Sequence, residues 1–179
     1  MTRAPLTGLV AVAALFMLGC QPQATTLSDA QKAAVADSAK TVVQRIITNS
    51  NKLDFPAAFQ DYSADADAKF TENGALYASL DAMKKAYADL LPTMEIVENT
   101  VDAWNVTVLA SDAAAVTLPI HLRIKAKGRP EYKGQYVWSG IVQRRSGTWK
   151  LIQSHESWQN AEQIMAAITP EIVQAGKQK

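Results

Sequence analysis

Residues 134–157 read GQYVWSGIVQRRSGTWKLIQSHES, and they decide the fold more than any other part of the chain. Two runs rich in valine, isoleucine and tryptophan, which favour strands, flank the dipeptide Ser146-Gly147. A two-residue turn there would join the runs as a hairpin and set which residues lie opposite one another. The pairs expected across this ladder are Tyr136 with Ser157, Trp138 with His155, Gly140 with Gln153 and Val142 with Leu151.

The segments before this hairpin also alternate with a period of two. Strands are expected over 95–109 and 113–125, separated by Ser111-Asp112. Together with the two halves of the hairpin they make a meander of antiparallel strands, which requires helices to cover one of its faces.

The N-terminal half carries helical spacing instead. Ser28 begins a capping box, and apolar residues after it recur at helical intervals, which predicts a first helix that ends near residue 48. Asp54 and Ser79 are expected to cap two further helices, and Asn73-Gly74 between them predicts a small hairpin. We therefore expect an α+β domain in which N-terminal helices pack on a curved antiparallel sheet.

A helical extension is expected over 159–179. Asn160 can cap it, and Ile164, Met165 and Ile168 form an apolar stripe. The stripe can bury against the domain's own sheet or against a second chain. The first alternative is favoured, because apolar stripes more often belong to an intramolecular core.

The order of elements and the closing hairpin resemble the SnoaL-like branch of the nuclear transport factor two-like superfamily. The resemblance is carried by residues 140–152, GIVQRRSGTWKLI, and by His155-Glu156-Ser157 after them. It covers residues 28–158 and implies a cone-like fold with a pocket inside the cone. Since one scaffold hosts many activities, the resemblance implies a fold more than a reaction.

The first twenty residues resemble a bacterial lipoprotein signal. A basic residue precedes an apolar stretch, and Met17-Leu18-Gly19-Cys20 resembles the lipobox that is cut before its cysteine. This resemblance implies a signal peptide over 1–19, acylation of Cys20 with groups such as palmitate, and a lipidated cysteine and tether over 20–27. By resemblance to lipoprotein sorting in Gram-negative bacteria, Gln21 after the cysteine implies the outer membrane, with the domain facing the periplasm.

Charge and composition exclude several classes of partner. Eighteen basic and seventeen acidic residues leave a formal net charge of +1, so no long-range field attracts nucleic acid. His121 and Arg123 are expected on a solvent-facing side of their strand. His121 and His155 occur without an acidic or thiolate ligand at a fixed spacing, so no metal is expected, and no cofactor motif is present.

The predicted hairpin supplies the candidate binding residues. Aromatic walls with a few polar groups suit a small-molecule pocket, and Gly140 would leave room in it. The predicted ligand-binding residues on this face are Tyr136, Trp138, Gln153 and His155. The other face of the hairpin has smaller side chains and is an equal candidate for the side that meets the helices.

No catalytic constellation is visible, and His155 and Asp102 are only weak candidates. A single titratable group without a visible partner favours a structural role for His155. An isomerase of the ketosteroid type would need a carboxylate base and a tyrosine in a dry cavity. Asp102 reads more simply as an exposed strand charge, and core packing explains the available tyrosines, Tyr62, Tyr77 and Tyr87.

Three functions remain after these observations. The first is a lipid-anchored envelope domain that binds a small apolar or amphipathic ligand or serves as an accessory module. The second is an isomerase, dehydratase or cyclase of the same fold. The third is a structural homodimer. An enzyme is less favoured, because nucleophilic motifs and phosphate-binding loops are missing.

Overall fold

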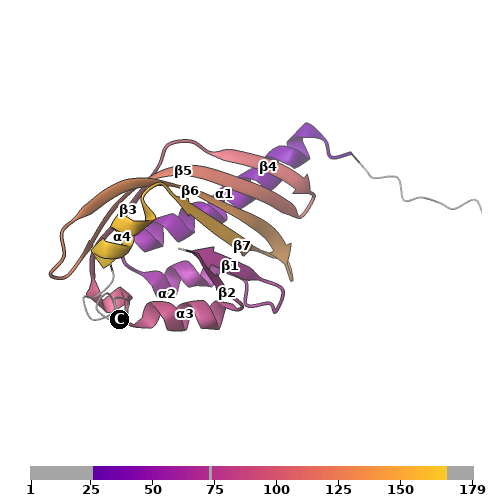
Figure 1. Ribbon diagram of the computed structural model, residues 1–179. Coiled ribbons are helices and arrows are strands. Elements are labelled where there is room, and N and C mark those ends of the chain that lie inside the picture. Colours follow the sequence, from indigo (N-terminus) through magenta and orange to yellow (C-terminus); the bar gives the residue numbers. More distant parts are fainter. Residues whose placement is uncertain (1–25, 73, 169–179) are drawn as a thin grey trace, which may run out of the picture.

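The computed structural model describes residues 26–72 and 74–168 and has two layers (Figure 1). One layer is a strongly curved, unclosed sheet, and the N-terminal helices lie along its concave side (Figure 1). The predicted α+β class, with helices packed on a curved antiparallel sheet, is confirmed. Burial of one helix stripe against one sheet face accounts for both layers.

The sheet has seven strands in the order β2-β1-β7-β6-β5-β3, with β4 beside β5. All neighbours are antiparallel except β1 and β7, which run parallel. The strands are β1 (Lys69–Glu72), β2 (Ala75–Tyr77), β3 (Met94–Val101), β4 (Asn105–Ala110), β5 (Ala113–Ala126), β6 (Tyr132–Arg145) and β7 (Thr148–Trp158).

The prediction of one strand over 95–109 is wrong, because β3 and β4 occupy this segment as two strands. Both pair with β5, β4 along its first half and β3 along its second half. The interruption lies beside Pro119 of β5, which has no N–H to offer a neighbouring strand. The Asp102 backbone N–H donates to the Pro119 carbonyl at 3.0 Å, and the chain bends there.

The helices begin where their caps predict. Helix α1 (Asp29–Asn51) starts with the Ser28 capping box and runs slightly beyond the predicted end. Asp54 caps α2 (Phe55–Ala58), which continues into the 3-10 turn η1 (Phe59–Asp61). Ser79 caps α3 (Leu80–Ala88), and η2 (Leu91–Thr93) leads into β3. The α1 stripe is buried against the sheet through Val35, Ala39, Val42, Val43, Ile46 and Ile47.

Both predicted hairpins are present, and Asn73 of the first turn lies outside the described residues. Gly74 has a φ of +78° between β1 and β2, a conformation that glycine adopts without strain. Ser146 and Gly147 have φ values of 49° and 82°, and Arg145 lies opposite Thr148. Two central residues with positive φ make the type of turn that matches the twist of a two-residue hairpin.

A β-bulge in β7 changes the register beyond this turn. Val142 lies opposite Leu151 as predicted, but Ile141 lies opposite Gln153, so Ile152 is the extra residue. The remaining predicted pairs are therefore wrong: Trp138 lies opposite Glu156, Tyr136 opposite Trp158 and Gly140 opposite Ser154. A shift of one residue moves each side chain of the strand to the other face of the sheet.

The concave face is the one that carries Tyr136 and Trp138. Both are buried, and so are Leu118, Ile120 and Leu122 on the neighbouring strand β5. Gly140 lets the Trp138 ring lie across the strand, since a Cβ at this position would sit 2.5 Å from the Cη2 atom of the ring. The face of the hairpin that carries Tyr136 and Trp138 is therefore the face that meets the helices.

Helix α4 (Ala161–Ile168) packs on the domain's own sheet, against β5 and β6. Ile164 is only 2% exposed and is buried within the chain, whereas Met165, which was predicted to belong to the same stripe, is 38% exposed. The part of the extension after residue 168, the signal peptide, Cys20 and most of the tether lie outside the described residues. None of the helices in the described part of the chain is long and apolar enough to cross a membrane.

Candidate ligand-binding cavity

A cavity of about 140 Å³ lies between the concave face of the sheet and the helices. Its walls are largely apolar, with contributions from α1, β3, β5 and β6, and Ile164 and Ile168 of α4 form part of the lining. Seven aromatic residues line it: Phe55, Phe59, Tyr62, Tyr87, Tyr136, Trp138 and Trp158. Such walls favour a ligand with an apolar or aromatic body.

Two glutamates, Glu72 and Glu156, supply the charge in this cavity. Strands β1 and β7 run parallel, with Phe70 beside Ser154 and Thr71 beside His155, so the next position on each strand brings Glu72 and Glu156 together. Both follow the alternation that places Phe70 and Ser154 in the interior. The carboxyl groups therefore share the concave side of two hydrogen-bonded strands.

Glu72 is buried without a full set of hydrogen-bond partners. Its residue is 5% exposed, and its Oε2 atom has no partner among the described residues. Glu156 is partly buried, and its Oε2 accepts a hydrogen bond from the Trp158 indole Nε1 at 3.1 Å. An unsatisfied buried carboxyl oxygen is energetically unfavourable, and a bound molecule is a ready source of the missing partner.

The surroundings favour the neutral form of both carboxyl groups. Burial raises the pKa of Glu72 well above its usual range, and the nearby Glu156 raises it further. Burial also raises the pKa of Glu156, from 4.5 to about 7, against a smaller lowering by the Trp158 hydrogen bond. Near neutral pH the pair can therefore hold or release a proton.

Two buried tyrosines complete the polar part of the wall. Burial raises the pKa of Tyr62 and Tyr136 well above the usual range, with the glutamates as further causes, so both phenols stay protonated at neutral pH. Tyr136 stacks on Trp158, with ring centroids 4.1 Å apart and planes 20° from parallel. Its hydroxyl donates to the Asn99 Oδ1 at 2.9 Å.

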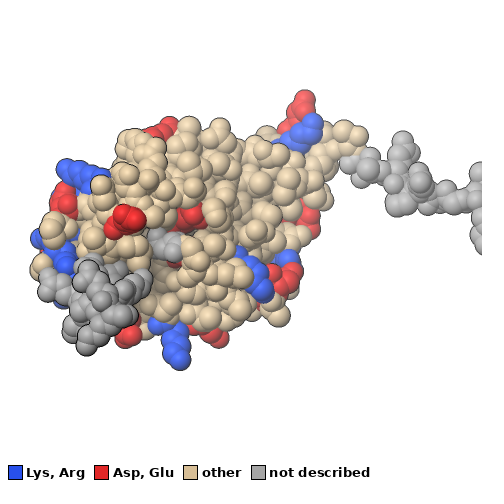
Figure 2. All heavy atoms as spheres, viewed as in Figure 1, with Lys and Arg blue, Asp and Glu red and all other residues tan. Residues whose placement is uncertain are grey.

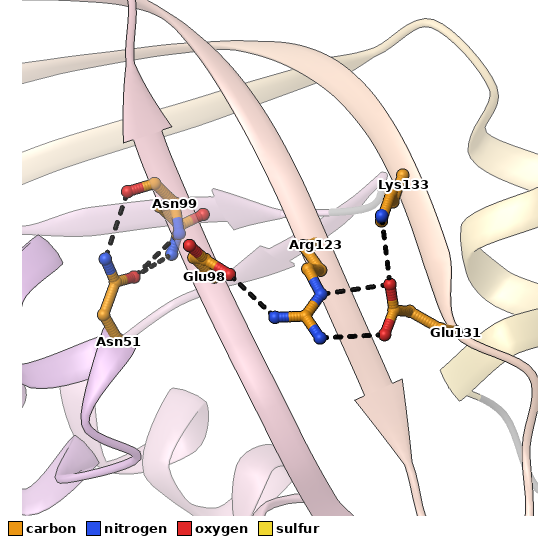
Figure 3. A network of polar contacts seen from close by, with 6 residues as sticks. All are labelled: Asn51, Glu98, Asn99, Arg123, Glu131 and Lys133. Carbon is orange, nitrogen blue, oxygen red and sulfur yellow. Dashed lines mark hydrogen bonds and ion pairs between the residues drawn. The ribbon is translucent and has the colours of Figure 1, made fainter.

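Asn51 at the end of α1 fixes the strand that holds this acceptor (Figure 3). The Asn51 Oδ1 accepts from the Asn99 backbone N–H at 2.8 Å and from the Asn99 Nδ2 at 3.0 Å. The Asn51 Nδ2 donates in turn to the Asn99 carbonyl at 3.1 Å. Helix α1, strand β3 and the Tyr136 ring are thereby held in one arrangement.

The four predicted ligand-binding residues separate into two pairs. Tyr136 and Trp138 line the cavity. Gln153 and His155 are exposed on the convex face and are not part of the lining, contrary to the predicted shared face. The bulge at Ile152 causes this difference, because it turns Ser154 and Glu156 inward in their place.

The weak catalytic candidates also lie on the outside of the sheet. The Asp102 Oδ2 lies 3.0 Å from the His121 Nε2, and both side chains are about half exposed. His121 and Arg123 occupy the solvent side of β5, as predicted. In the ranges 26–72 and 74–168 no group of three or more histidine, cysteine, aspartate or glutamate side chains is placed to hold a metal ion.

Sequence reasoning missed both glutamates of the cavity. A signal for Glu72 was present, because it lies two residues after the apolar Phe70 in the strand of the predicted hairpin, and alternation puts both on one face. Glu156 had no such signal. Its inward position depends on the bulge, and a simple two-residue hairpin points it outward.

The family and the fold have known counterparts. A family model described as "SnoaL-like domain" matches residues 39–161. A search of curated proteins finds no match to the chain. A nuclear transport factor 2-like superfamily protein from Salmonella enterica has a similar structure, with a TM-score of 0.63 and 13% identity, over 70% of this chain and 92% of that one.

Two further solved structures are similar in fold. Hexachlorocyclohexane dehydrochlorinase LinA-type3 from Novosphingobium barchaimii matches with a TM-score of 0.63 and 14% identity, over 74% of this chain and 91% of that one. A provisionally named scytalone dehydratase from Novosphingobium aromaticivorans matches with a TM-score of 0.66 and 10% identity, over 73% and 88%. At such identities the likeness shows the cone fold alone.

Proposed function

Since the chain belongs to the SnoaL-like domain family, we propose that it uses the interior of its cone to bind a small, largely apolar molecule of about the size of one ring. The observation that carries this proposal is an aromatic cavity with an unsatisfied carboxyl oxygen in its wall. The volume of about 140 Å³ sets the size, because an apolar cavity of roughly 150 Å³ accepts benzene.

Native mass spectrometry and titration calorimetry of the purified full chain test this proposal. We expect a reproducible retained mass, or binding of toluene and benzyl alcohol added as probes. Val97→Phe fills the cavity from β3 and is expected to weaken probe binding at least about tenfold. Val137→Phe makes the same change on the exposed face of β6 and should leave binding unchanged. A cavity that retains no mass and takes neither probe would contradict the proposal.

Acid–base catalysis is the second candidate function, and the glutamate pair is the observation that favours it. One protonated and one ionised carboxyl group side by side can donate and accept a proton at the same ligand. The names of two similar structures, a dehydratase and a dehydrochlorinase, describe eliminations, in which a base removes a proton. Isomerisation or dehydration of a ring-sized substrate in this cavity would use the same groups.

Hydrogen–deuterium exchange next to the carbonyl of cyclohexanone tests this second candidate directly. If Glu156 is the base, Glu156→Gln should reduce the catalysed exchange rate by about 100-fold or more. The matched controls are His155→Gln and Asp102→Asn, which change titratable groups on the outer face. Exchange that depends on either control residue, or that no variant changes, would contradict the assignment.

We also propose that acylation of Cys20 holds the domain at a bacterial membrane, on the outer membrane facing the periplasm. The lipobox Met17-Leu18-Gly19-Cys20 and the following Gln21 support this location. Cys20→Ser should abolish incorporation of labelled palmitate and move the protein out of the membrane fraction. The native mass spectrum also counts subunits, and so tests whether the chain forms the homodimer left open by its sequence.

A further inference from the structure

We propose that the ligand of this cavity is an organic cation, a protonated amine on an apolar body of ring size, held between the side chains of Glu72 and Glu156. This inference rests on the proposed function, since it names the chemical class of the molecule that occupies the cone. It goes further in assigning the ligand a charge and in assigning both glutamates to its recognition.

The charged side chains in the described cavity lining are two glutamates, and no basic side chain of the lining balances them. Among the described residues that line the cavity, there is no lysine, arginine or histidine. Basic side chains on neighbouring elements are committed elsewhere: the Arg45 Nε donates to Asp61 at 3.0 Å, and the Arg145 Nη2 donates to Asp67 at 2.9 Å. An anionic ligand would have no cationic side chain to pair with in this desolvated lining, so the site disfavours anions.

The charges on the rest of the protein do not offset the acidic character of the cavity. Basic and acidic side chains are dispersed over the surface seen in Figure 2, and the formal net charge of the chain is +1. The local charge of the glutamate pair therefore decides which ligand is favoured in the cavity. A cation there gains Coulomb energy that water would otherwise screen.

The hydrogen-bonding capacity of the pair matches an ammonium group. Glu156 receives one hydrogen bond from Trp158, and the Glu72 Oε2 receives none. An ammonium carries three donors and no acceptor, so it can serve both carboxylates at once. A neutral carbonyl or hydroxyl offers acceptors mainly, and it would need one glutamate to remain protonated.

The aromatic lining suits a cation as well as an apolar body. Tyr136 and Trp158 form a stacked pair beside Glu156, and Trp138 lies across from Glu156 on β6. Ring faces attract ammonium ions, most strongly where water is excluded. The apolar remainder of the ligand would contact the Ile120 and Leu122 side chains of β5, which also line the cavity.

Binding of such a ligand must depend on pH in a defined direction. The ionisable groups that interact with Glu156 are Glu72 on β1, Tyr62 after η1, Tyr77 on β2 and Tyr136 on β6. The tyrosines stay neutral, so only the glutamates change charge near neutral pH. Protons compete with the amine for the carboxylates; the affinity for an amine should rise as Glu156 ionises through about pH 7.

Calorimetric titration of the full chain with benzylamine and with benzyl alcohol tests the inference, because the two probes share a shape and differ in charge. At about pH 8 an alkylammonium is still protonated, and we expect benzylamine to bind at least about tenfold more tightly than the alcohol. At about pH 6 this preference should shrink, and amine binding should release protons, seen as a dependence of the measured heat on the buffer.

Substitutions of Glu72 and Glu156 test whether these residues cause the preference for benzylamine. Glu72→Gln and Glu156→Gln should each weaken benzylamine binding about tenfold and change benzyl alcohol binding less than about threefold. Glu162→Gln removes an exposed carboxylate of α4 and should change neither. If benzyl alcohol binds as well as benzylamine, the inference is overturned and the proposed function stands. If neither probe binds, the inference is overturned, and the proposed function is then decided by toluene binding and the retained mass.

Discussion

Carboxylates occur on both sides of the curved sheet, and their partners differ between the two sides. On the convex face, Arg123 donates to Glu131 through its Nε at 3.0 Å and to Glu98 through its Nη1 at 3.0 Å (Figure 3). In the cavity, the lining around Glu72 and Glu156 includes no basic residue among those described. The outer carboxylates accept hydrogen bonds from a basic side chain of the same chain. The inner pair includes a carboxyl oxygen without a partner, which another molecule can bind.

This difference distinguishes carboxylates that need no ligand to explain them from carboxylates that do. Exposed ion pairs contribute little to stability and need no ligand to explain them. Buried acids without counter-charges destabilise the empty fold, so their presence in a well-formed aromatic cavity supports the proposed binding role. Asp102 also has a partner at the surface, since its Oδ2 lies 3.0 Å from the His121 Nε2.

The largest expected effect distinguishes the two faces of one strand. Trp138 is 7% exposed on the concave side of β6, and the adjacent Val137 is 44% exposed on the convex side. Trp138→Ala should lower the free energy of unfolding by about 3–5 kcal/mol, because it empties a packed site. Val137→Ala should lower it by less than about 1 kcal/mol. Urea denaturation of the two variants checks this, and equal losses would contradict the assignment of the faces.

The next effect concerns the pH dependence of stability. The pKa of Glu156 is raised from 4.5 to about 7 in the folded chain. Between these two pH values the folded state keeps a proton on Glu156 that the unfolded state has lost. Stability is therefore full below about pH 4.5 and falls as the pH rises towards 8, by about 3 kcal/mol for this group. Glu72 acts in the same direction.

Urea denaturation of the ligand-free chain at about pH 5 and pH 8 measures this loss. Glu156→Gln should reduce the difference between the two pH values, since glutamine stays neutral at both, and the difference that remains is due to Glu72. An unchanged pH dependence in this variant would show that Glu156 is not the titrating group.

The smallest effect has the opposite sign and belongs to the convex face. The Arg123 hydrogen bond lowers the pKa of Glu131, so the stability from this pair is present above the usual glutamate pKa and is lost as the pH falls through the lowered value. Glu131→Gln should remove part of the acid sensitivity, and added salt should weaken the effect. Urea midpoints at about pH 3 and pH 6 test this, and loss of stability on the alkaline side instead would contradict it.

Local features of the chain were predicted reliably because their causes are local. Ser28, Asp54 and Ser79 cap helices through atoms only a few residues away. Ser146-Gly147 makes a two-residue turn because both residues adopt positive φ. Alternation along β5 and β6 identified the strands, and Tyr136 and Trp138 were recognised as residues of one wall.

Two features of the site have no local cause. The bulge at Ile152 adds one residue to β7, and no residue type in that segment requires it. The break between β3 and β4 was likewise missed, because it depends on Pro119 of the neighbouring strand β5. Each error therefore arose where one strand's shape depends on its partner.

The sequence by itself determined the class of the fold, the caps and turns, and the aromatic character of the cavity wall, because short-range geometry and side-chain periodicity are written in neighbouring residues. The tertiary structure decided which acids face inward. The parallel pairing of β1 with β7 places Glu72 beside Glu156, and the bulge turns Glu156 rather than His155 into the cone. Register between strands distant in the sequence is set by packing of the whole sheet, and so the chemistry of the cavity emerged only with the fold.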